Sequence, residues 1–290
     1  MIQYHNLKII DINLENAITN HSADKVIAYK TTQNERISLG FYFPSSFEST
    51  KKHPTFLLIH GGGWSTHKIF NDQNHWSGDY LGFLCRYYAE KGFVTVSIDY
   101  RLIRQNGHAS GYGILNCYED CCDAVAYILA HAAEYGVDTE CLYLLGESAG
   151  GHLAGLLISP SDTRIYSFKK AFLINPITDL YDEKWNWAVP IHDSMDEIAN
   201  LHQKKQAEFL SPLYRACANT CEVILIHGEA DTTVDLKHSQ KFYDRMQELC
   251  ISCELHIIEK TKHAFLLAEY YPDIVACKMT IQMINERLGC

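Results

Sequence analysis

The feature that most constrains this chain is a repeated alternation of short apolar runs with segments of helical periodicity. Continuous apolar runs recur at residues 55–60, 93–98, 141–145, 171–174, 223–226 and 255–258. Runs without polar alternation are typical of parallel strands that are covered on both faces. Segments with helical spacing of apolar residues occupy residues 80–91, 117–135, 149–158, 236–249 and 272–288. The sequence therefore predicts an α/β fold with a mostly parallel central sheet and helices on both faces.

Two stretches interrupt this rhythm and predict additions to a single domain over residues 1–290. They are residues 1–35 and the tryptophan-containing residues 179–212, which we take as candidate cap or lid elements. Residues 36–43 (RISLGFYF) alternate and predict an early antiparallel strand. A chain of 290 residues suits one large domain with a well-buried core.

Composition excludes several classes of partner. The formal net charge is −10, so the average surface would repel a phosphate backbone, and nucleic acid is not an expected partner. No apolar run approaches the roughly 20 residues of a membrane-spanning helix. The N-terminus also lacks the basic and long apolar regions of a signal peptide. We therefore expect a cytoplasmic protein with no membrane partner, while composition leaves the oligomeric state open, a homodimer included.

The 11 cysteines are predicted to be reduced thiols, because their number is odd and no secretion sequence precedes them. Cys250 and Cys253 have C-x-x-C spacing, but no second pair follows at the distance typical of a zinc ribbon. Buried small apolar side chains are the simpler interpretation. We therefore predict no metal site.

A candidate nucleophile lies between an apolar run and a helix. Residues 146–150 (GESAG) match G-x-S-x-G, with a predicted strand before the motif and a predicted helix after it. The backbone is crowded at such a turn, and glycines two residues before and after the serine remove Cβ atoms that would clash. The hydroxyl of Ser148 would project above the carboxyl edge of the sheet, beside a helix N-terminus that favours negative charge. The alternative is a helix-capping serine in a tight turn.

A glycine-rich loop, residues 60–64 (HGGGW), follows the first apolar run. Attack on an ester carbonyl places a negative charge on the carbonyl oxygen, and backbone amides aimed at that oxygen stabilise it. Successive glycines let the backbone turn its amides inward. We assign the amides of Gly62, Gly63 and Ala149 to an oxyanion hole. The alternative is a flexible loop without a catalytic role.

Two further residues complete a candidate catalytic triad. In serine hydrolases built on a parallel sheet of this kind, the chain order is serine, acid, histidine. Asp231 and His263 each follow a predicted strand by a few residues, at the edge where Ser148 is expected. We therefore predict that His263 is the general base and that Asp231 orients it.

The 15 histidines of the chain require that rivals be weighed. The rival bases lie at a strand end, inside a strand or on helices: His227, His256, His152 and His238. For His227, packing or capping is the expected role. The rival acids are Asp235 and Glu229. Asp99 and Arg101, in the stretch SIDYRL, are predicted to be structural residues near the glycine-rich loop.

Together these motifs resemble the hormone-sensitive-lipase-like branch of the α/β hydrolases, which includes many microbial carboxylesterases. The matching pieces are HGGGW at 60–64, SIDYRL at 97–102, GESAGG at 146–151, HGEADTTV at 227–234 and KHAF with His263. The resemblance implies an α/β-hydrolase fold and ester hydrolysis through an acyl-enzyme, with no cofactor. The family's serine, acid and histidine correspond to Ser148, Asp231 and His263, and two of its oxyanion glycines to Gly62 and Gly63.

Two departures from the family bear on the substrate. The stretch after SIDYRL, IRQNGHASGYG, replaces a proline-rich continuation, and N-terminal cap helices are hard to recognise. Smaller relatives with shortened caps include sugar-ester and xylan acetylesterases, so we expect a small, short-chain acyl ester, with acetylated carbohydrates as one candidate. Trp64, Trp185 and Trp187 are candidate pocket walls, because aromatic faces suit acyl chains and sugar rings. Packing within the core or cap is the alternative for each.

Three other functions fit part of this pattern. A serine peptidase or amidase would share the triad and differ in the leaving group. An arylformamidase would also have a loop of the HGG type. A non-catalytic binding protein on the same fold is the third, because fold alone does not define function. The triad and the oxyanion loop favour a serine hydrolase over a binding protein, since binding alone has no use for them, and the family resemblance favours a carboxylesterase among the hydrolases.

Overall fold

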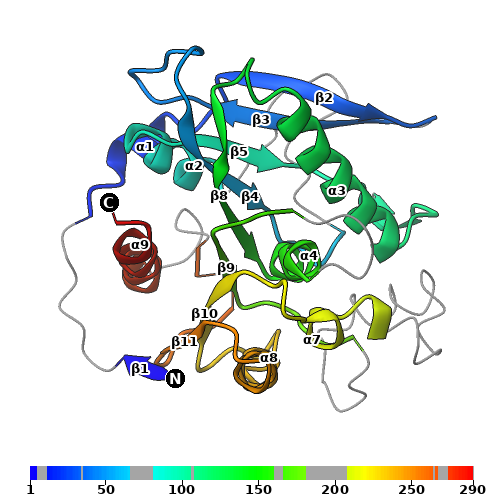
Figure 1. Ribbon diagram of the computed structural model, residues 1–290. Coiled ribbons are helices and arrows are strands. Elements are labelled where there is room, and N and C mark those ends of the chain that lie inside the picture. Colours follow the sequence, from blue (N-terminus) through cyan, green and yellow to red (C-terminus); the bar gives the residue numbers. More distant parts are fainter. Residues whose placement is uncertain are drawn as a thin grey trace.

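The computed structural model describes residues 1–4, 12–33, 35–65, 81–105, 108–159, 166–180, 208–263, 265–266 and 274–289. Within this part of the chain, nine strands form one sheet in the order β1-β11-β10-β9-β8-β4-β5-β3-β2 (Figure 1). The strands are β1 (Ile2–Tyr4), β2 (Lys25–Thr31), β3 (Arg36–Tyr42), β4 (His53–Ile59), β5 (Val94–Ile98), β8 (Val137–Glu147), β9 (Lys170–Ile174), β10 (Glu222–Gly228) and β11 (Cys253–Ile258). Neighbours pair in parallel except β3, which is antiparallel to β2 and β5. This confirms the predicted mostly parallel sheet.

The helices cover both faces of the sheet (Figure 1). They are α1 (Glu15–Thr19), α2 (Gly82–Glu90), α3 (Ile114–Ala130), α4 (Ala149–Ile158), α7 (Pro212–Arg215), α8 (Lys237–Glu248) and α9 (Ile274–Leu288). Side chains of α1, α2 and α9 pack with one set of strand residues, which includes Phe56 and Leu58. Side chains of α3, α4 and α8 pack with another set, which includes Leu57 and Ile59. Because successive strand residues point to opposite faces, a continuous apolar run such as β4 contributes to both layers.

The structure describes most of one candidate cap and little of the other. Residues 1–35 contribute β1, which pairs with β11, and β2, which pairs with β3, so these strands form the two edges of the sheet. Helix α1 packs beside α2 in the same apolar layer. In the other candidate cap, 179–212, residues 181–207 lie outside the described part. A short hairpin, β6 (Arg104–Gln105) with β7 (His108–Ala109), follows the SIDYRL stretch.

The cysteines in the described part are free thiols, as predicted. Burial raises the pKa of Cys253 to about 12, which disfavours the thiolate that redox or metal chemistry needs. Burial likewise raises the pKa of Cys277 to about 12.

None of the helices described is long and apolar enough to cross a membrane.

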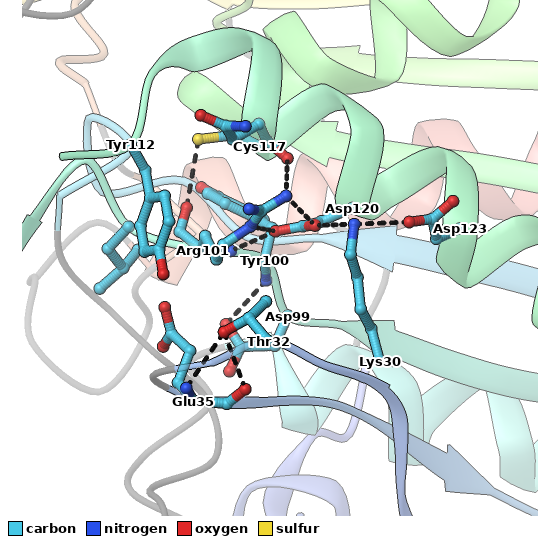
Figure 2. Close-up of polar contacts among 12 residues, drawn as sticks. Lys30, Thr32, Glu35, Asp99, Tyr100, Arg101, Tyr112, Cys117, Asp120 and Asp123 are labelled. Atoms are coloured by element: carbon cyan, nitrogen blue, oxygen red, sulfur yellow. Dashed lines mark hydrogen bonds and ion pairs between the residues drawn. The ribbon is translucent and has the colours of Figure 1, made fainter. Parts of the chain in front are cut away.

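A buried carboxylate joins the N-terminal strands to the helical layer (Figure 2). Asp120, on α3, is fully buried and accepts hydrogen bonds from Arg101 Nε and Nη2, both at 2.7 Å, and from the Arg101 backbone amide at 2.9 Å. Lys30, on β2, donates to the same carboxylate at 2.7 Å and also to Asp123. The Arg101 guanidinium lies 4.9 Å from the ring centre of Tyr112. The predicted structural role of Arg101 therefore takes the form of a pair with Asp120.

We expect Asp120→Asn to lower the free energy of unfolding by about 3–5 kcal/mol, because it leaves a mostly buried guanidinium without its carboxylate. Asp123→Asn is the matched control, since the Asp123 side chain is 51% exposed and contacts the same lysine. That change should cost about 0–1 kcal/mol. Urea unfolding followed by circular dichroism measures both. Equal losses in the two variants would contradict this account.

Candidate active site

Ser148 occupies a sharp turn between β8 and α4. Its backbone has φ 55° and ψ −118°, a left-handed φ that non-glycine residues rarely adopt. The turn is tight because a Cβ atom at Gly146 would lie 2.2 Å from the carbonyl oxygen of Gly150. A Cβ atom at Gly150 would in turn lie 2.1 Å from the carbonyl oxygen of Ile59, at the end of β4. Glycine at both positions therefore allows the strained geometry that the sequence motif predicts.

The structure brings Ser148, His263 and Asp231 into one hydrogen-bonded chain. The Nε2 atom of His263 lies 2.8 Å from Ser148 Oγ, and its Nδ1 atom lies 2.6 Å from Asp231 Oδ2. Asp231 follows β10 and His263 follows β11, and both strands end at the same edge of the sheet as β8. Because Asp231 accepts at Nδ1, the unprotonated Nε2 of a neutral His263 faces the serine hydroxyl.

The Asp231 carboxylate is anchored on both oxygens. Its Oδ1 atom accepts hydrogen bonds from the backbone amides of Thr233, at 2.8 Å, and Val234, at 2.9 Å. Burial alone would raise the pKa of Asp231, but hydrogen bonds from His227 and His263 outweigh it and hold the pKa well below its usual value. Asp231 is therefore a carboxylate throughout the neutral range.

The electrostatic environment of His263 favours its charged form. Burial would lower the pKa of His263, but the hydrogen bond with Asp231 and the negative charges of Glu147 and Asp231 raise it above its usual value. A base with a raised pKa accepts a proton more readily, and the imidazolium that forms is stabilised by the adjacent carboxylate.

The rival histidines and acids have other partners. His152 Nε2 lies 2.6 Å from the carbonyl oxygen of Leu210, and burial lowers the pKa of His152 to about 4. His238 and His256 contact Thr178 and Tyr4, respectively. Asp235 accepts from the backbone amide of Lys237, and Glu229 accepts from Gln3 and from the amide of Lys260. The Nε2 atom of His227, by contrast, lies 3.4 Å from Asp231 Oδ2.

The glycine-rich loop begins where β4 ends and contains three left-handed residues. The φ angles of Gly62, Gly63 and Trp64 are 92°, 60° and 55°. Ala149 is the first residue of α4, directly after Ser148. Since Gly150 lies against the carbonyl oxygens of Ile59 and of the loop's first residue, the loop and the start of α4 are immediate neighbours. The three amides predicted for the oxyanion hole therefore belong to adjoining segments.

Buried polar residues hold the loop from beneath. His60 Nε2 lies 3.2 Å from Asp99 Oδ1, and His60 Nδ1 lies 2.9 Å from the carbonyl oxygen of Gly61. The Tyr100 hydroxyl donates to the carbonyl oxygens of His60, at 2.9 Å, and Gly61, at 3.2 Å. The rings of Tyr100 and His60 stack with centroids 4.3 Å apart. Asp99 therefore has the structural role near the loop that its position in the sequence predicts.

Of the predicted pocket walls, the described residues include Trp64 alone. Its side chain is fully buried and makes an edge-on contact with His152, with ring centroids 5.2 Å apart. This is the packing role that sequence analysis kept as the alternative, and the ring joins the glycine-rich loop to α4. Trp185 and Trp187 lie outside the described part. Within that part, no cluster of His, Cys, Asp and Glu side chains could hold a metal ion.

Comparison with known proteins identifies the family. The sequence profile of the BD-FAE family matches residues 39–246. The chain belongs to the BD-FAE family. That match spans the glycine-rich loop, the serine motif and Asp231.

Two relatives of this BD-FAE protein have the names of hydrolases. It is 26% identical over 229 residues to the "Probable carboxylic ester hydrolase LipM" of Mycobacterium tuberculosis. This alignment covers 73% of this chain and 49% of LipM. It is 24% identical over 264 residues to kynurenine formamidase of Danio rerio. This second alignment covers 90% of this chain and 81% of the formamidase. The chain thus spans about half the length of LipM but most of the formamidase.

Solved structures agree with the predicted fold. The apo form of Thermogutta terrifontis esterase 2 matches with a TM-score of 0.74 and 25% identity, over 91% of this chain and 93% of the esterase. The predicted α/β-hydrolase fold is therefore confirmed, and so is the resemblance to carboxylesterases. The BD-FAE chain groups with carboxylesterase-type hydrolases.

The raised pKa of His263 predicts how activity depends on pH. Catalysis by a neutral histidine should increase as pH rises through the pKa of His263, which lies above its usual value. Asp231→Asn removes a negative charge that raises this pKa, so the acid limb of the kcat/KM profile should move to lower pH. Turnover should also fall, by up to about 10⁴-fold. A pH–rate series on both proteins measures this, and an acid limb unmoved by the substitution would count against the assignment of His263.

Proposed function

We propose that this protein hydrolyses small, short-chain carboxylic esters through an acyl-enzyme on Ser148. The observation that carries the proposal is the hydrogen-bonded chain from Ser148 Oγ to His263, at 2.8 Å, and from His263 to Asp231, at 2.6 Å. A buried carboxylate, an oriented imidazole and a hydroxyl on a strained turn are the parts that nucleophilic catalysis by serine needs.

The proposed reaction has two halves. His263 Nε2 takes the hydroxyl proton as Ser148 Oγ attacks the ester carbonyl, and the resulting imidazolium then protonates the departing alcohol. A water molecule next gives a proton to His263 while its oxygen attacks the acyl-enzyme, and collapse of the second intermediate returns that proton to Ser148. Asp231 stabilises the imidazolium in both halves and keeps its own negative charge.

The amides of Gly62, Gly63 and Ala149 are the proposed oxyanion donors. Two features support this assignment: the left-handed backbone at Gly62 and Gly63, and the close contact between their loop and the start of α4. The dipole of α4 would add favourable potential at its N-terminus, where the oxyanion forms.

A short acyl chain is the proposed substrate feature. Structures of Thermogutta terrifontis esterase 2, at 25–26% identity to this chain, hold propionate or butyrate, and another is phosphonylated by sarin. Acetylated carbohydrates are a narrower proposal within this class, and they rest on the resemblance of the sequence to acetylesterases with shortened caps.

Formamide hydrolysis is the second candidate. The match to kynurenine formamidase extends over 90% of this chain and 81% of that protein, whereas the match to LipM covers only 49% of LipM. An arylformamidase would use the same serine, histidine and aspartate, with an aromatic amine as the leaving group. Hydrolysis of N-formyl aromatic amines at a higher kcat/KM than acetate esters would favour this candidate.

We expect p-nitrophenyl acetate and butyrate to be hydrolysed faster than the decanoate, because a short-acyl pocket excludes long chains. Ser148→Ala is the control and should reduce kcat by about 10⁶-fold, to the level of the uncatalysed reaction plus binding. Activity towards none of the esters above this control would contradict the esterase proposal.

Labelling by a fluorophosphonate probe tests the nucleophile without a substrate. The probe should attach to Ser148 in the unsubstituted protein and fail to attach in Ser148→Ala, as read by mass spectrometry of the labelled peptide. Absence of labelling in the unsubstituted protein would favour a binding protein on this fold.

A further inference from the structure

A second histidine contacts the acid of the proposed triad. His227, near the end of β10, has no exposed surface, and its Nε2 atom lies 3.4 Å from Asp231 Oδ2. The same carboxylate oxygen lies 2.6 Å from His263 Nδ1. The Asp231 side chain is also fully buried, so water does not compete for this oxygen. Two imidazole rings therefore meet at one oxygen atom.

Contacts on both ring nitrogens define the hydrogen-bonding role of His227. Besides Asp231, its Nε2 atom faces the carbonyl oxygen of Val234 at 2.9 Å. Both of these groups accept hydrogen bonds, so Nε2 must carry a proton. On the other side, Nδ1 lies 2.8 Å from the hydroxyl of Ser239, on α8, which can donate to it. The contacts fit a neutral imidazole whose donor points into the Asp231 turn.

We propose that His227 is a positioning residue for the triad: its Nε2–H group, which donates to the Val234 carbonyl oxygen and lies 3.4 Å from Asp231 Oδ2, fixes the turn that carries Asp231 and limits the negative charge that His263 receives. The catalytic part of this inference rests on the proposed function, whereas the hydrogen-bonded arrangement does not. From its position at a strand end, His227 was weighed as a rival base and expected to pack or cap.

The turn that carries Asp231 depends on this ring for its shape. Val234 donates its amide to Asp231 Oδ1 and offers its carbonyl oxygen to His227. His227, which precedes the turn, thus contacts the carbonyl oxygen of Val234 at its end and one oxygen of the Asp231 carboxylate within it. Without this Nε2–H group, the Val234 carbonyl oxygen would lose its donor and Asp231 Oδ2 would lose a nearby partial positive charge, while Oδ1 would keep its two backbone donors and Oδ2 its hydrogen bond with His263.

The charged and titratable groups around the two histidines determine whether loss of the His227 donor should raise or lower the pKa of His263. His263 faces Asp231 and the charge of Glu147, from β8, and both raise its pKa. His227 faces Asp231 in its own turn and His238 on α8, whose burial lowers its pKa well below the usual value, so His238 is neutral. Loss of the Nε2–H donor would leave more negative charge on Oδ2. The pKa of His263 should therefore rise further.

Three substitutions distinguish the effect of the Nε2–H donor from the effect of the volume of the ring. Glutamine places its amide nitrogen near the position of the histidine Nε2 atom, whereas asparagine places it near Nδ1. His227→Gln should therefore keep an N–H donor that faces Val234 and Asp231, while His227→Asn should keep only the contact with Ser239. His227→Phe fills the same space and removes both contacts. His256→Phe is the structural control, since His256 is equally buried in the adjacent strand and contacts Tyr4 and Glu254 instead.

The first measurement is the pKa of His263, read by proton NMR from the downfield Nδ1–H resonance during a pH titration. We expect His227→Phe and His227→Asn to raise this pKa by roughly half a unit or more, and His227→Gln and His256→Phe to leave it in place. In the same proteins, kcat on p-nitrophenyl acetate should fall about tenfold or more for Phe and Asn, with KM nearly unchanged. The Gln variant should recover most of the lost activity.

The outcomes distinguish this inference from the proposed function. A His263 pKa that stays in place or falls in both His227→Phe and His227→Asn overturns the inference, even if the esterase is active. A shift shared by His256→Phe overturns it as well, because it would reflect general destabilisation. If the unsubstituted protein hydrolyses no ester but the pKa moves as expected, the proposed function fails and the positioning of Asp231 by His227 stands.

Discussion

The close approach of α4 to the end of β4 is the contact on which the site depends. A Cβ atom at Gly150 would lie 2.1 Å from the carbonyl oxygen of Ile59, so only glycine fits there. This contact places Ser148, at the start of α4, beside the glycine-rich loop that continues from β4. The distance between Ser148 and the glycine-rich loop is therefore set by backbone packing at the centre of the sheet, where parallel pairing leaves little freedom of movement.

Buried carboxylates hold the segments that the sheet alone does not fix. Asp99 contacts His60 beneath the glycine-rich loop, Asp231 orients His263, and Asp120 joins α3 to Arg101 and Lys30. Each of these groups is costly to bury, and each has the donors that offset this cost. Their shared effect is to hold these segments in one geometry, which is the preorganisation that the proposed mechanism needs when charge develops.

Elements of the sheet interior were predictable because their sequence patterns are strong. The predicted helix at 149–158 has the bounds of α4, and each predicted strand lies within or largely overlaps an observed one. The edge strands β1 and β2 were missed because they are partly exposed and their side chains lack a continuous apolar run. Trp64 was expected as a candidate pocket wall, yet tertiary packing turns its ring into the core against α4. Composition does not reveal which way an aromatic ring will turn.

The sequence by itself determined the fold class and the residue types of the site, because periodicity reports burial and the serine motif needs glycines at fixed spacing. Chain order then singled out Asp231 and His263 as candidates. Only the tertiary structure showed that two histidines share one oxygen of the acid: His227 lies four residues before Asp231, whereas His263 reaches the same oxygen through the pairing of β10 with β11. The His263 contact depends on β11 lying beside β10, and residues close to Asp231 in the sequence do not encode that neighbour.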